Sequence, residues 1–258
     1  MPNTVACFKW VRDSQDIVIR PDLSIDMSRA GGKISEYDRN VIQAASTLSK
    51  AMEGKALGLT FGDETLKPVL KDALSRGLDE VYYLSDAMQA NADGAVTAKV
   101  LSAMIRKMPD VAVVFCAEGA EDTFARQVGP RIAACLGWPI LSSVCHFEVN
   151  DGIVTAKRKL EDFYETVTVP CPVVIAILPD AADAPIPGLR AVMAAGKKPQ
   201  HAVALEDLGT EYSTLARKTQ LVLEQGYLMQ RKHIKFSDGD DREKVDAFLR
   251  ALTKEGVL

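Results

Sequence analysis

The sequence predicts a doubly wound α/β fold, in which helices cover both faces of a mostly parallel sheet. Through about residue 140, short apolar runs alternate with segments of helical periodicity. The runs are continuous rather than alternating, as expected for parallel strands that are covered on both sides. Strand–helix–strand repetition of this kind is typical of α/β domains. The chain has 258 residues, 47% of them hydrophobic, which is enough to form a core without disulfides or metals.

Strands and helices are expected to alternate in this part of the chain. The strands should lie at the apolar runs, over residues 5–11, 56–61, 81–84 and 111–116. The helices follow from apolar residues at helical spacing, over residues 41–52, 66–74, 95–105 and 124–132.

Two of these helices carry capping signals. Ser35 stands three residues before Asp38, which predicts a capping-box-like start for the helix that contains Val41. Gly77 follows the next helix in the position that a C-cap prefers.

The pattern changes after Pro139, where we expect an antiparallel extension. Residues 142–149 and 153–160 flank Asn150-Asp151-Gly152, which indicates a hairpin turn because these residues tolerate positive φ. Strand-like segments at residues 164–169 and 173–178 follow, so an antiparallel hairpin patch is predicted beside the parallel sheet.

The C-terminal part is expected to pack less. The Pro- and Ala-rich residues 179–187 indicate an exposed loop. From about Leu205 the chain is polar and weakly patterned, until a short helical pattern begins at Val245. We therefore expect an α/β domain over residues 1–204 and an extended arm over residues 205–258, which is either flexible or lies on a partner.

Composition excludes several classes of protein. The net charge of −4 argues against a nucleic-acid grip, which needs a clustered basic face. No apolar run approaches the length of a membrane span, and the N-terminus lacks the features of a signal peptide. Five cysteines without a C-x-x-C pair fit reduced thiols, so a soluble, cytoplasmic protein is expected.

Common catalytic and metal motifs are missing from the sequence. The three histidines, His146, His201 and His233, have no ligand-like spacing, so no metal site is expected. The sequence has no G-x-S-x-G elbow, P-loop or G-x-G-x-x-G fingerprint. The acids of residues 238–243 lack the spacing of an EF-hand loop and indicate a solvated turn.

The carboxyl ends of parallel strands are where open α/β sheets bind ligands, and three segments are expected to meet there. They are Cys7-Phe8-Lys9, Phe61-Gly62-Asp63 and residues 117–123. Gly119 would let backbone N–H groups approach an anion, and the start of the following helix would add its positive dipole end. Arg126 and Gln127, placed one turn into that helix, could donate to phosphate oxygens.

The acids of this loop narrow the choice of ligand. Glu118, Glu121 and Asp122 disfavour a triphosphate and suit a ribose hydroxyl, or a phosphate that the backbone holds. In the alternative interpretation, Asp122 is only an N-cap and Gly119 only a turn residue. These residues by themselves predict a nucleotide-binding α/β domain and no more.

Several longer stretches share features with a known family. Residues 156–176 contain a basic residue, an acidic cluster, Glu165 and then Pro172 before an apolar strand. Residues 121–129 match as well, as do Pro185-Ile186-Pro187-Gly188-Leu189 leading to Lys197-Lys198. The chain thus resembles the β subunit of electron transfer flavoproteins over most of its length. Phe163 departs from the pattern, because the family usually has Gly, Asp or Glu there.

The branch of the family is indicated by the N-terminal part. Residues 6–17, together with residues 33–38, look most like the Fix-type branch. The resemblance implies a Rossmann-like, adenine-nucleotide-binding fold and a heterodimer with an α subunit that carries FAD. The β subunit would hold AMP or a second FAD. It would do no bond-breaking of its own.

The resemblance also implies partners and site residues. Electrons would pass from acyl-CoA-type or other dehydrogenases to a quinone-linked reductase or ferredoxin, without nucleic acid or membrane insertion. The arm of residues 205–258 would wrap the α subunit, and Ile186 would anchor docking to a dehydrogenase unless it packs on its own domain. The nucleotide would touch Cys7, Ser35, Glu36, Tyr37, Asp38, Phe61, Ala117, Gly119, Asp122, Thr123, Arg126, Gln127 and Val128.

Two other functions are compatible with a nucleotide-binding sheet. A stand-alone, stress-protein-like nucleotide-binding domain would need a glycine loop of the ATP type after the fourth strand and would lack the long tail. An adenylating or nucleotide-hydrolysing enzyme would need a strong phosphate loop and a pair of metal-binding carboxylates. The sequence contains neither signature.

Overall fold

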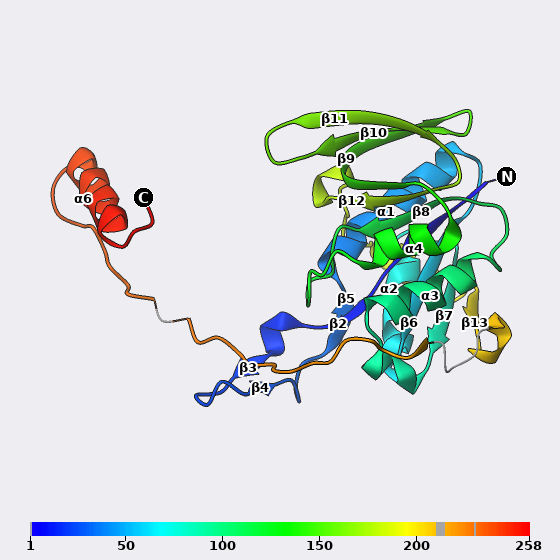
Figure 1. The fold of residues 1–258 in the computed structure, drawn as a ribbon, viewed down its shortest axis with the longest axis horizontal. Helices are drawn as coiled ribbons and strands as arrows, with labels where there is room; N and C mark the ends of the chain where they lie inside the picture. The colour runs from blue at the N-terminus through cyan, green and yellow to red at the C-terminus, as the bar shows by residue number, and fades with distance from the viewer. Residues whose placement is uncertain (1, 210–214, 230) are drawn as a thin grey trace. The chain divides into compact units, whose positions relative to one another are not determined.

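A nine-stranded sheet organises the larger part of the computed structural model, which describes residues 2–209, 215–229 and 231–258 (Figure 1). The strand order is β11-β10-β9-β12-β8-β1-β6-β7-β13. All neighbours are parallel except β10, which is antiparallel to both β9 and β11. The strands are β1 (Asn3–Cys7), β6 (Ala56–Gly62), β7 (Glu80–Ser85), β8 (Val111–Ala117), β9 (Ile140–Asn150), β10 (Ile153–Lys159), β11 (Tyr164–Pro170), β12 (Val173–Ile177) and β13 (Gln200–Ala202). The predicted fold class is confirmed.

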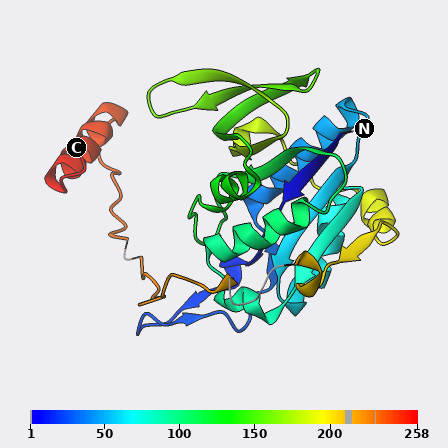
Figure 2. The same ribbon diagram turned by 45° about the vertical axis from the view of Figure 1, so that its right-hand side comes forward.

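Helices cover both faces of the sheet (Figures 1 and 2). One hydrophobic cluster joins one face to α1, α2 and α5, and a second joins the opposite face to α3 and α4. The helices are α1 (Glu36–Ala51), α2 (Lys67–Ser75), α3 (Gly94–Ile105), α4 (Val128–Leu136) and α5 (Leu189–Ala195). Single 3₁₀ turns lie at Ser14–Asp16, Glu64–Leu66, Ala87–Asn91, Pro179–Ala181 and Glu206–Leu208.

The order of the strands reverses next to β1. From β1 the chain adds β6 and β7 on one side, and it then returns to place β8 on the other side of β1. The connections therefore leave β1 and β8 toward opposite faces, which opens a crevice at the carboxyl ends of these strands.

The first predicted strand is divided in the structure. Residues 5–11 were expected to form one strand, but β1 ends at Cys7 and β2 (Trp10–Arg12) pairs antiparallel with β5 (Gly32–Ile34) in a separate small sheet. The run stays apolar because Phe8 and Val11 are both buried, although the chain changes its pairing partner between them. The prediction of one strand over residues 5–11 is therefore wrong, although the run of apolar residues is continuous.

The fourth predicted helix begins later than expected. Phe124 and Arg126 have φ angles of 45° and 57°, which an α-helix does not allow, and α4 starts only at Val128. The Phe124 ring instead packs against the ring of Tyr37, with their centroids 5.6 Å apart. The helical spacing of Phe124 and Val128 was therefore misleading.

The hairpin predicted after Pro139 is confirmed. Asp151 and Gly152 have φ angles of 50° and 75°, and they join β9 to β10. The last strand of this region, β12, does not belong to the antiparallel patch, because it lies between β8 and β9 and is parallel to both. All five of its residues are buried, as its continuous apolar sequence would indicate. Helix α5 and strand β13 were not predicted.

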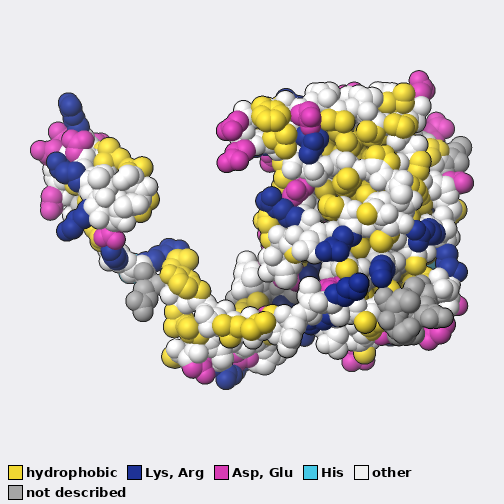
Figure 3. Space-filling view, in the orientation of Figure 1, with side chains coloured by type: hydrophobic (Ala, Val, Ile, Leu, Met, Phe, Trp, Pro, Cys, Tyr) yellow, Lys and Arg dark blue, Asp and Glu magenta, His cyan; other side chains and the backbone are white. Residues whose placement is uncertain are grey.

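The remaining residues form a second, small unit of Ile19–Ile25 and Gln225–Leu258. Within it, the strands β3 (Val18–Ile19) and β4 (Ile25–Asp26) border a turn, and the Gly226 N–H donates to the Leu23 carbonyl at 2.8 Å. Helix α6 (Asp241–Lys254) confirms the predicted last helix. Apolar side chains line one side of α6, and charged side chains cover other parts of it (Figure 3).

The acids before α6 have a structural role. The Asp240 carboxylate accepts from the Glu243 N–H at 2.9 Å, and the Glu243 carboxylate accepts from the Asp240 N–H at 3.0 Å. This reciprocal pair is a capping box, as an acidic turn at a helix start favours. In the described part of the chain, every helix is too short or too polar to span a lipid bilayer.

The predicted division at residue 205 remains a prediction. Leu205, Leu208 and Leu215 are buried in the hydrophobic cluster that also contains α3. An arm that starts at residue 205 would therefore begin with a packed segment. Part of that arm, residues 210–214 and 230, lies outside the described residues.

The centre of the sheet offers a test of the fold. Phe115 in β8 is fully buried, and its ring lies 5.0 Å from that of Phe147, centroid to centroid. We expect Phe115→Ala to lower the free energy of unfolding by about 3–5 kcal/mol in urea denaturation of the full chain. Phe163→Ala is the matched control, because Phe163 is 59% exposed and should change stability by no more than about 0.5 kcal/mol. Equal losses in the two variants would contradict the described core.

Candidate functional site

A cavity of about 370 Å³ lies at the crevice beside β1. Its walls come from the carboxyl ends of β1, β6 and β8, from the loop after β8, and from the N-terminal turns of α3 and α4. This volume is near the lower end of the range of about 300–1,000 Å³ that is usual for small-molecule sites.

Most residues predicted to touch a nucleotide line this cavity. The strand ends and α1 contribute Cys7, Phe61 and Asp38. The loop after β8 and the start of α4 contribute Ala117, Gly119, Thr123, Arg126, Gln127 and Val128. The other predicted residues, Ser35, Glu36, Tyr37 and Asp122, are not among the lining residues, and they lie in the contacts that hold the lining loops.

The start of α1 is tied to two of these loops. The Ser35 hydroxyl accepts from the Glu121 N–H at 3.2 Å, and the Asp38 carboxylate accepts from the Lys9 N–H at 2.7 Å. Ser35 is the N-cap of α1, so the predicted start of this helix is confirmed, but its side chain makes no cap hydrogen bond and the capping-box pattern is wrong. Both side chains are buried and fix loops that are remote in sequence.

A three-way ion network holds the loop after β8. Lys33 Nζ lies 2.9 Å from the Glu121 carboxylate and 3.2 Å from those of Asp13 and Glu36. Burial opposes the charged form of Lys33, but these hydrogen bonds outweigh it and raise the pKa of Lys33. The same ion pair lowers the pKa of Glu121 in spite of its burial. Glu36 therefore takes part in fastening the loop.

Asp122 and Tyr37 also belong to this support. The Asp122 carboxylate pairs with Lys9 Nζ at 2.6 Å and accepts from the Thr123 N–H at 2.8 Å. Asp122 does not cap the helix, because α4 begins six residues later, at Val128. Tyr37 contacts the loop through the Phe124 ring. The alternative interpretation of Asp122 as a helix N-cap is therefore wrong.

Two buried thiols lie at the base of the cavity. Cys7 and Cys116 are free, and they lie at the carboxyl ends of the neighbouring strands β1 and β8, Cys7 as the last residue and Cys116 as the last but one. A hydrogen bond with Cys116, together with burial, raises the pKa of Cys7 well above its ordinary value. A neutral thiol is a poor nucleophile, so Cys7 contributes an apolar surface rather than reactivity.

The wall formed by the loop after β8 and the start of α4 can accommodate an anion. Gln127, the N-cap of α4, makes no side-chain cap hydrogen bond, so the first N–H groups of α4 are left for another acceptor. The Arg126 guanidinium stacks over the Phe124 ring at 4.7 Å, and no carboxylate of the described residues pairs with it. Gly119 is required in this loop, since a Cβ there would lie 2.7 Å from the Phe124 ring.

Several lining residues were missed by the sequence analysis. The third strand, β7, leads through Gln89 to Asp93, Gly94 and Thr97, all of which line the cavity. The Asp93 carboxylate accepts from the N–H groups of Ala95 and Val96 at 3.0 Å, and these bonds lower its pKa to about 2. The rule that ligands bind at strand ends applies to β7 as well and could have identified this wall.

Another missed contribution comes from beyond residue 214. Arg217 and Thr219 line the same cavity. Thr219 donates to the Asp93 carboxylate, which is distant in sequence, and no local sequence motif predicts this contact.

The residues that carry the family resemblance join the antiparallel strands. Arg158 Nη1 pairs with the Glu165 carboxylate at 2.5 Å across β10 and β11. Arg158 Nε donates to the Ser142 carbonyl at 2.8 Å on β9. The Glu118 carboxylate accepts from the Ser143 N–H at 2.9 Å, which connects this patch to the cavity loop.

The Pro-rich loop before α5 is exposed at its apolar tip. Ile186 is 93% exposed, so the alternative in which it packs on its own domain is wrong. Leu189 and Met193 on α5 are 79% and 70% exposed. Together with Ile186, they give this region an apolar surface that the chain itself does not cover.

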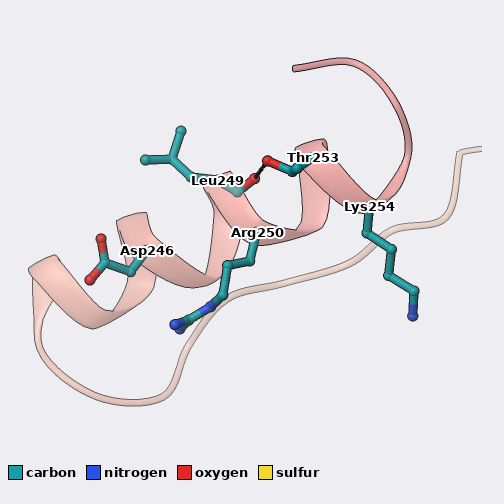
Figure 4. Close-up of a pocket in the computed structure, with 5 residues that line it drawn as sticks. All are labelled: Asp246, Leu249, Arg250, Thr253 and Lys254. Carbon is teal, nitrogen blue, oxygen red and sulfur yellow. Dashed lines mark hydrogen bonds between the residues drawn. The ribbon is translucent and has the colours of Figure 1, made fainter.

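A shallow pocket on α6 is formed by one element, unlike the cavity beside β1, which several elements enclose. Its walls are side chains of this one helix, Asp246, Leu249, Arg250, Thr253 and Lys254 (Figure 4). The Thr253 hydroxyl donates to the Leu249 carbonyl of its own helix at 3.0 Å. One exposed helix face does not enclose a ligand. No group of three or more potential metal ligands is found among the described residues.

The buried carboxyl of Asp38 gives a pH-dependent prediction. Burial raises its pKa to about 7, although the Lys9 N–H and charge act in the opposite direction. An unfolded Asp ionises near pH ~4, so the stability that this group contributes is complete below about pH 4 and is lost as the pH rises through about 7. Asp38→Asn keeps an acceptor oxygen for the Lys9 N–H but does not ionise.

We therefore expect Asp38→Asn to gain stability relative to the unmodified chain as the pH rises from about 4 to about 8, by about 1–4 kcal/mol. Urea denaturation at several pH values measures this difference. Asp63→Asn is the control, because hydrogen bonds from Thr65 lower the pKa of Asp63, so its ionisation affects stability only below about pH 4 and little change is expected between about pH 4 and 8. A stability difference for Asp38→Asn that does not change with pH would contradict the assignment.

Comparison with known families agrees with this architecture. The family model of the electron transfer flavoprotein domain matches residues 22–208, which is more than half of the chain. The matched range includes most of the sheet and the loop after β8. Proteins of this family are electron carriers rather than catalysts, and they generally bind flavin. The chain belongs to the electron transfer flavoprotein domain family.

Proposed function

We propose that this chain is the β subunit of a heterodimeric electron transfer flavoprotein of the Fix-type branch, and that its cavity holds an adenine nucleotide. The observation that carries the proposal is the cavity at the reversal of strand order, lined by residues that the family resemblance implies for the nucleotide. The α subunit would hold the FAD that carries the electrons.

The residues of the cavity fit the parts of a nucleotide. Phe61, Cys7 and Leu101 give an apolar surface that suits an adenine ring. The Glu118 carboxylate, which lines the cavity, can accept from a ribose hydroxyl. Arg126 and the first N–H groups of α4 can donate to a phosphate.

The ligand is AMP or a second FAD. The cavity lies near the lower end of the usual size range, so it favours the mononucleotide. A second FAD would have to extend beyond the walls described above. The chemistry of such a ligand would differ as well, because AMP would only support the structure, whereas a second flavin would exchange electrons.

In electron transfer, the chain's own role is to hold the α subunit with its FAD and to dock to a dehydrogenase. The FAD supplies the redox chemistry when it is bound, and the protein supplies position and electrostatics. Electrons would enter from acyl-CoA-type or other dehydrogenases and leave to a quinone-linked reductase or ferredoxin. No acid–base or nucleophilic residue of this chain is needed for that role.

Docking to a dehydrogenase is assigned to the loop that carries Ile186. Two prolines flank Ile186 and restrict its backbone, so little conformational entropy is lost when this side chain is buried by a partner. Leu189 and Met193 extend the exposed apolar surface along α5.

The arm of residues 205–258 is assigned to the α subunit. Large apolar side chains are exposed along it, which is unusual unless a partner covers them. They are Leu221, Val222, Leu223, Tyr227, Leu228, Met229, Ile234, Val245, Phe248, Leu249, Val257 and Leu258.

A stand-alone, stress-protein-like nucleotide-binding domain is the second candidate. The observation in its favour is the cavity at the strand ends of a doubly wound sheet, which that function would use as well. The exposed arm and the docking loop have no role in that alternative, so we place it second.

The heterodimer is tested by co-expressing the chain with its α partner and releasing the bound nucleotides with acid. We expect one FAD and one AMP per heterodimer. Two FADs would keep the heterodimer but assign the cavity to a second flavin. Failure to retain an α partner, or the absence of both nucleotides, would contradict the proposal.

The docking loop is tested by Ile186→Ala in the same heterodimer. Loss of a buried apolar anchor should slow electron transfer from the dehydrogenase about 10-fold or more, since anchor residues contribute about 2 kcal/mol or more to an interface. The flavin content should not change. Ile153→Ala is the matched control, because Ile153 is also an exposed isoleucine but lies in the hairpin, and it should transfer at the normal rate. An unchanged rate in Ile186→Ala, or loss of its flavin, would overturn the assignment.

A further inference from the structure

The segment after residue 214 reaches the nucleotide cavity. Leu215 is buried in the hydrophobic cluster that contains α3, and Arg217 and Thr219 line the cavity. We call residues 215–219 the strap. It precedes the exposed part of the arm directly, since the next exposed apolar residue is Leu221.

Asp93 fastens the strap. One of its carboxylate oxygens, Oδ2, accepts from the Lys218 N–H and from the Thr219 hydroxyl, both at 3.2 Å. The other, Oδ1, caps α3. Asp93 thus connects the strap to the helix that forms one wall of the cavity, and this full set of donors agrees with its lowered pKa.

Arg217 brings an uncompensated charge to the cavity. Its Nε donates to the Thr219 carbonyl within the strap, and none of the carboxylates in the described ranges forms an ion pair with it. Arg126, which also lines the cavity, likewise has no carboxylate partner among the described residues, whereas Lys9 is paired with Asp122. Two guanidinium groups that line one cavity and pair with no carboxylate of the described residues favour an anionic ligand, and guanidinium matches phosphate geometry well.

We propose that the strap closes over the nucleotide and that Arg217 binds its phosphate. This inference rests on the proposed function, in which the cavity holds an adenine nucleotide. It adds a binding residue outside the region that matches the family, which ends at residue 208. The strap makes the site selective for phosphorylated ligands over nucleosides.

Closure also links the nucleotide to the arm. A ligand that binds better when the strap is seated must stabilise the seated strap by the same factor. The nucleotide therefore restrains residues of the arm that directly precede its exposed apolar side chains. Under this proposal, an AMP that takes no part in electron transfer still affects how the arm is presented to a partner.

The test compares AMP with adenosine, which lacks the phosphate. Binding to the full chain, freed of nucleotide, is measured by titration calorimetry. Arg217→Ala should weaken AMP binding about 10-fold or more, as expected when a charge-assisted hydrogen bond is lost, and should leave adenosine binding unchanged. Lys218→Ala is the matched control, because it removes an equal charge from the same strap but a side chain that does not line the cavity.

Hydrogen exchange gives a second measurement that does not depend on the variant. AMP should slow the exchange of the Lys218 amide, which donates to Asp93, and of its neighbours in the strap, and adenosine should slow them less. The proposal for the strap would be overturned by equal AMP affinities for Arg217→Ala and Lys218→Ala, or by strap amides that AMP does not protect. The proposed nucleotide site would remain in either case. A chain that binds neither AMP nor adenosine would overturn both proposals.

Discussion

The reversal of strand order beside β1 is the constraint on which the rest of the structure depends. Because the connections that leave the neighbouring strands β1 and β8 go to opposite faces of the sheet, they cannot cover the same place. A crevice is therefore left at the carboxyl ends of these two strands, where the cavity lies. It cannot be filled by an adjacent helix, so the loops at the strand ends must either collapse into it or be held away from it.

In this chain the loops are held by buried polar contacts from α1 and β5. Ser35 and Asp38 accept backbone N–H groups of the loops after β8 and β1, and Lys33 binds the carboxylate of Glu121. These groups are mostly hidden from water, so each would be costly to leave without its partner. A buried polar group costs more when it loses its partner than its hydrogen bond adds to net stability. This difference favours a single arrangement of the loops, in which the cavity stays open.

The sequence predicted those elements whose burial shows in their own run of residues. It failed where a residue is buried by contacts that are distant in sequence. The strands of the parallel sheet are buried on both faces, so their continuous apolar runs identified them, and β6 is buried over its whole length. The same signal failed at Phe8, which stays buried after the chain has left the sheet. Phe124 was assigned to a helix by its spacing, but its contact is with Tyr37, far away in sequence. Helix α5 buries only Ala195, so it carried no amphipathic pattern.

The candidate site likewise has residues that the sequence could predict and residues that it could not. Residues at the ends of β1, β6 and β8 could be predicted because parallel topology brings strand ends together, and Asp93 could have been added by the same rule. Arg217 could not, because only the folded chain brings residues after 214 to the strand ends. A ligand bound there would contact both sides of the crevice and the strap at once, and it would favour the state in which all three are in place. A nucleotide without a catalytic role would thus stabilise the folded chain at the reversal of strand order, where the loops at the strand ends leave a cavity.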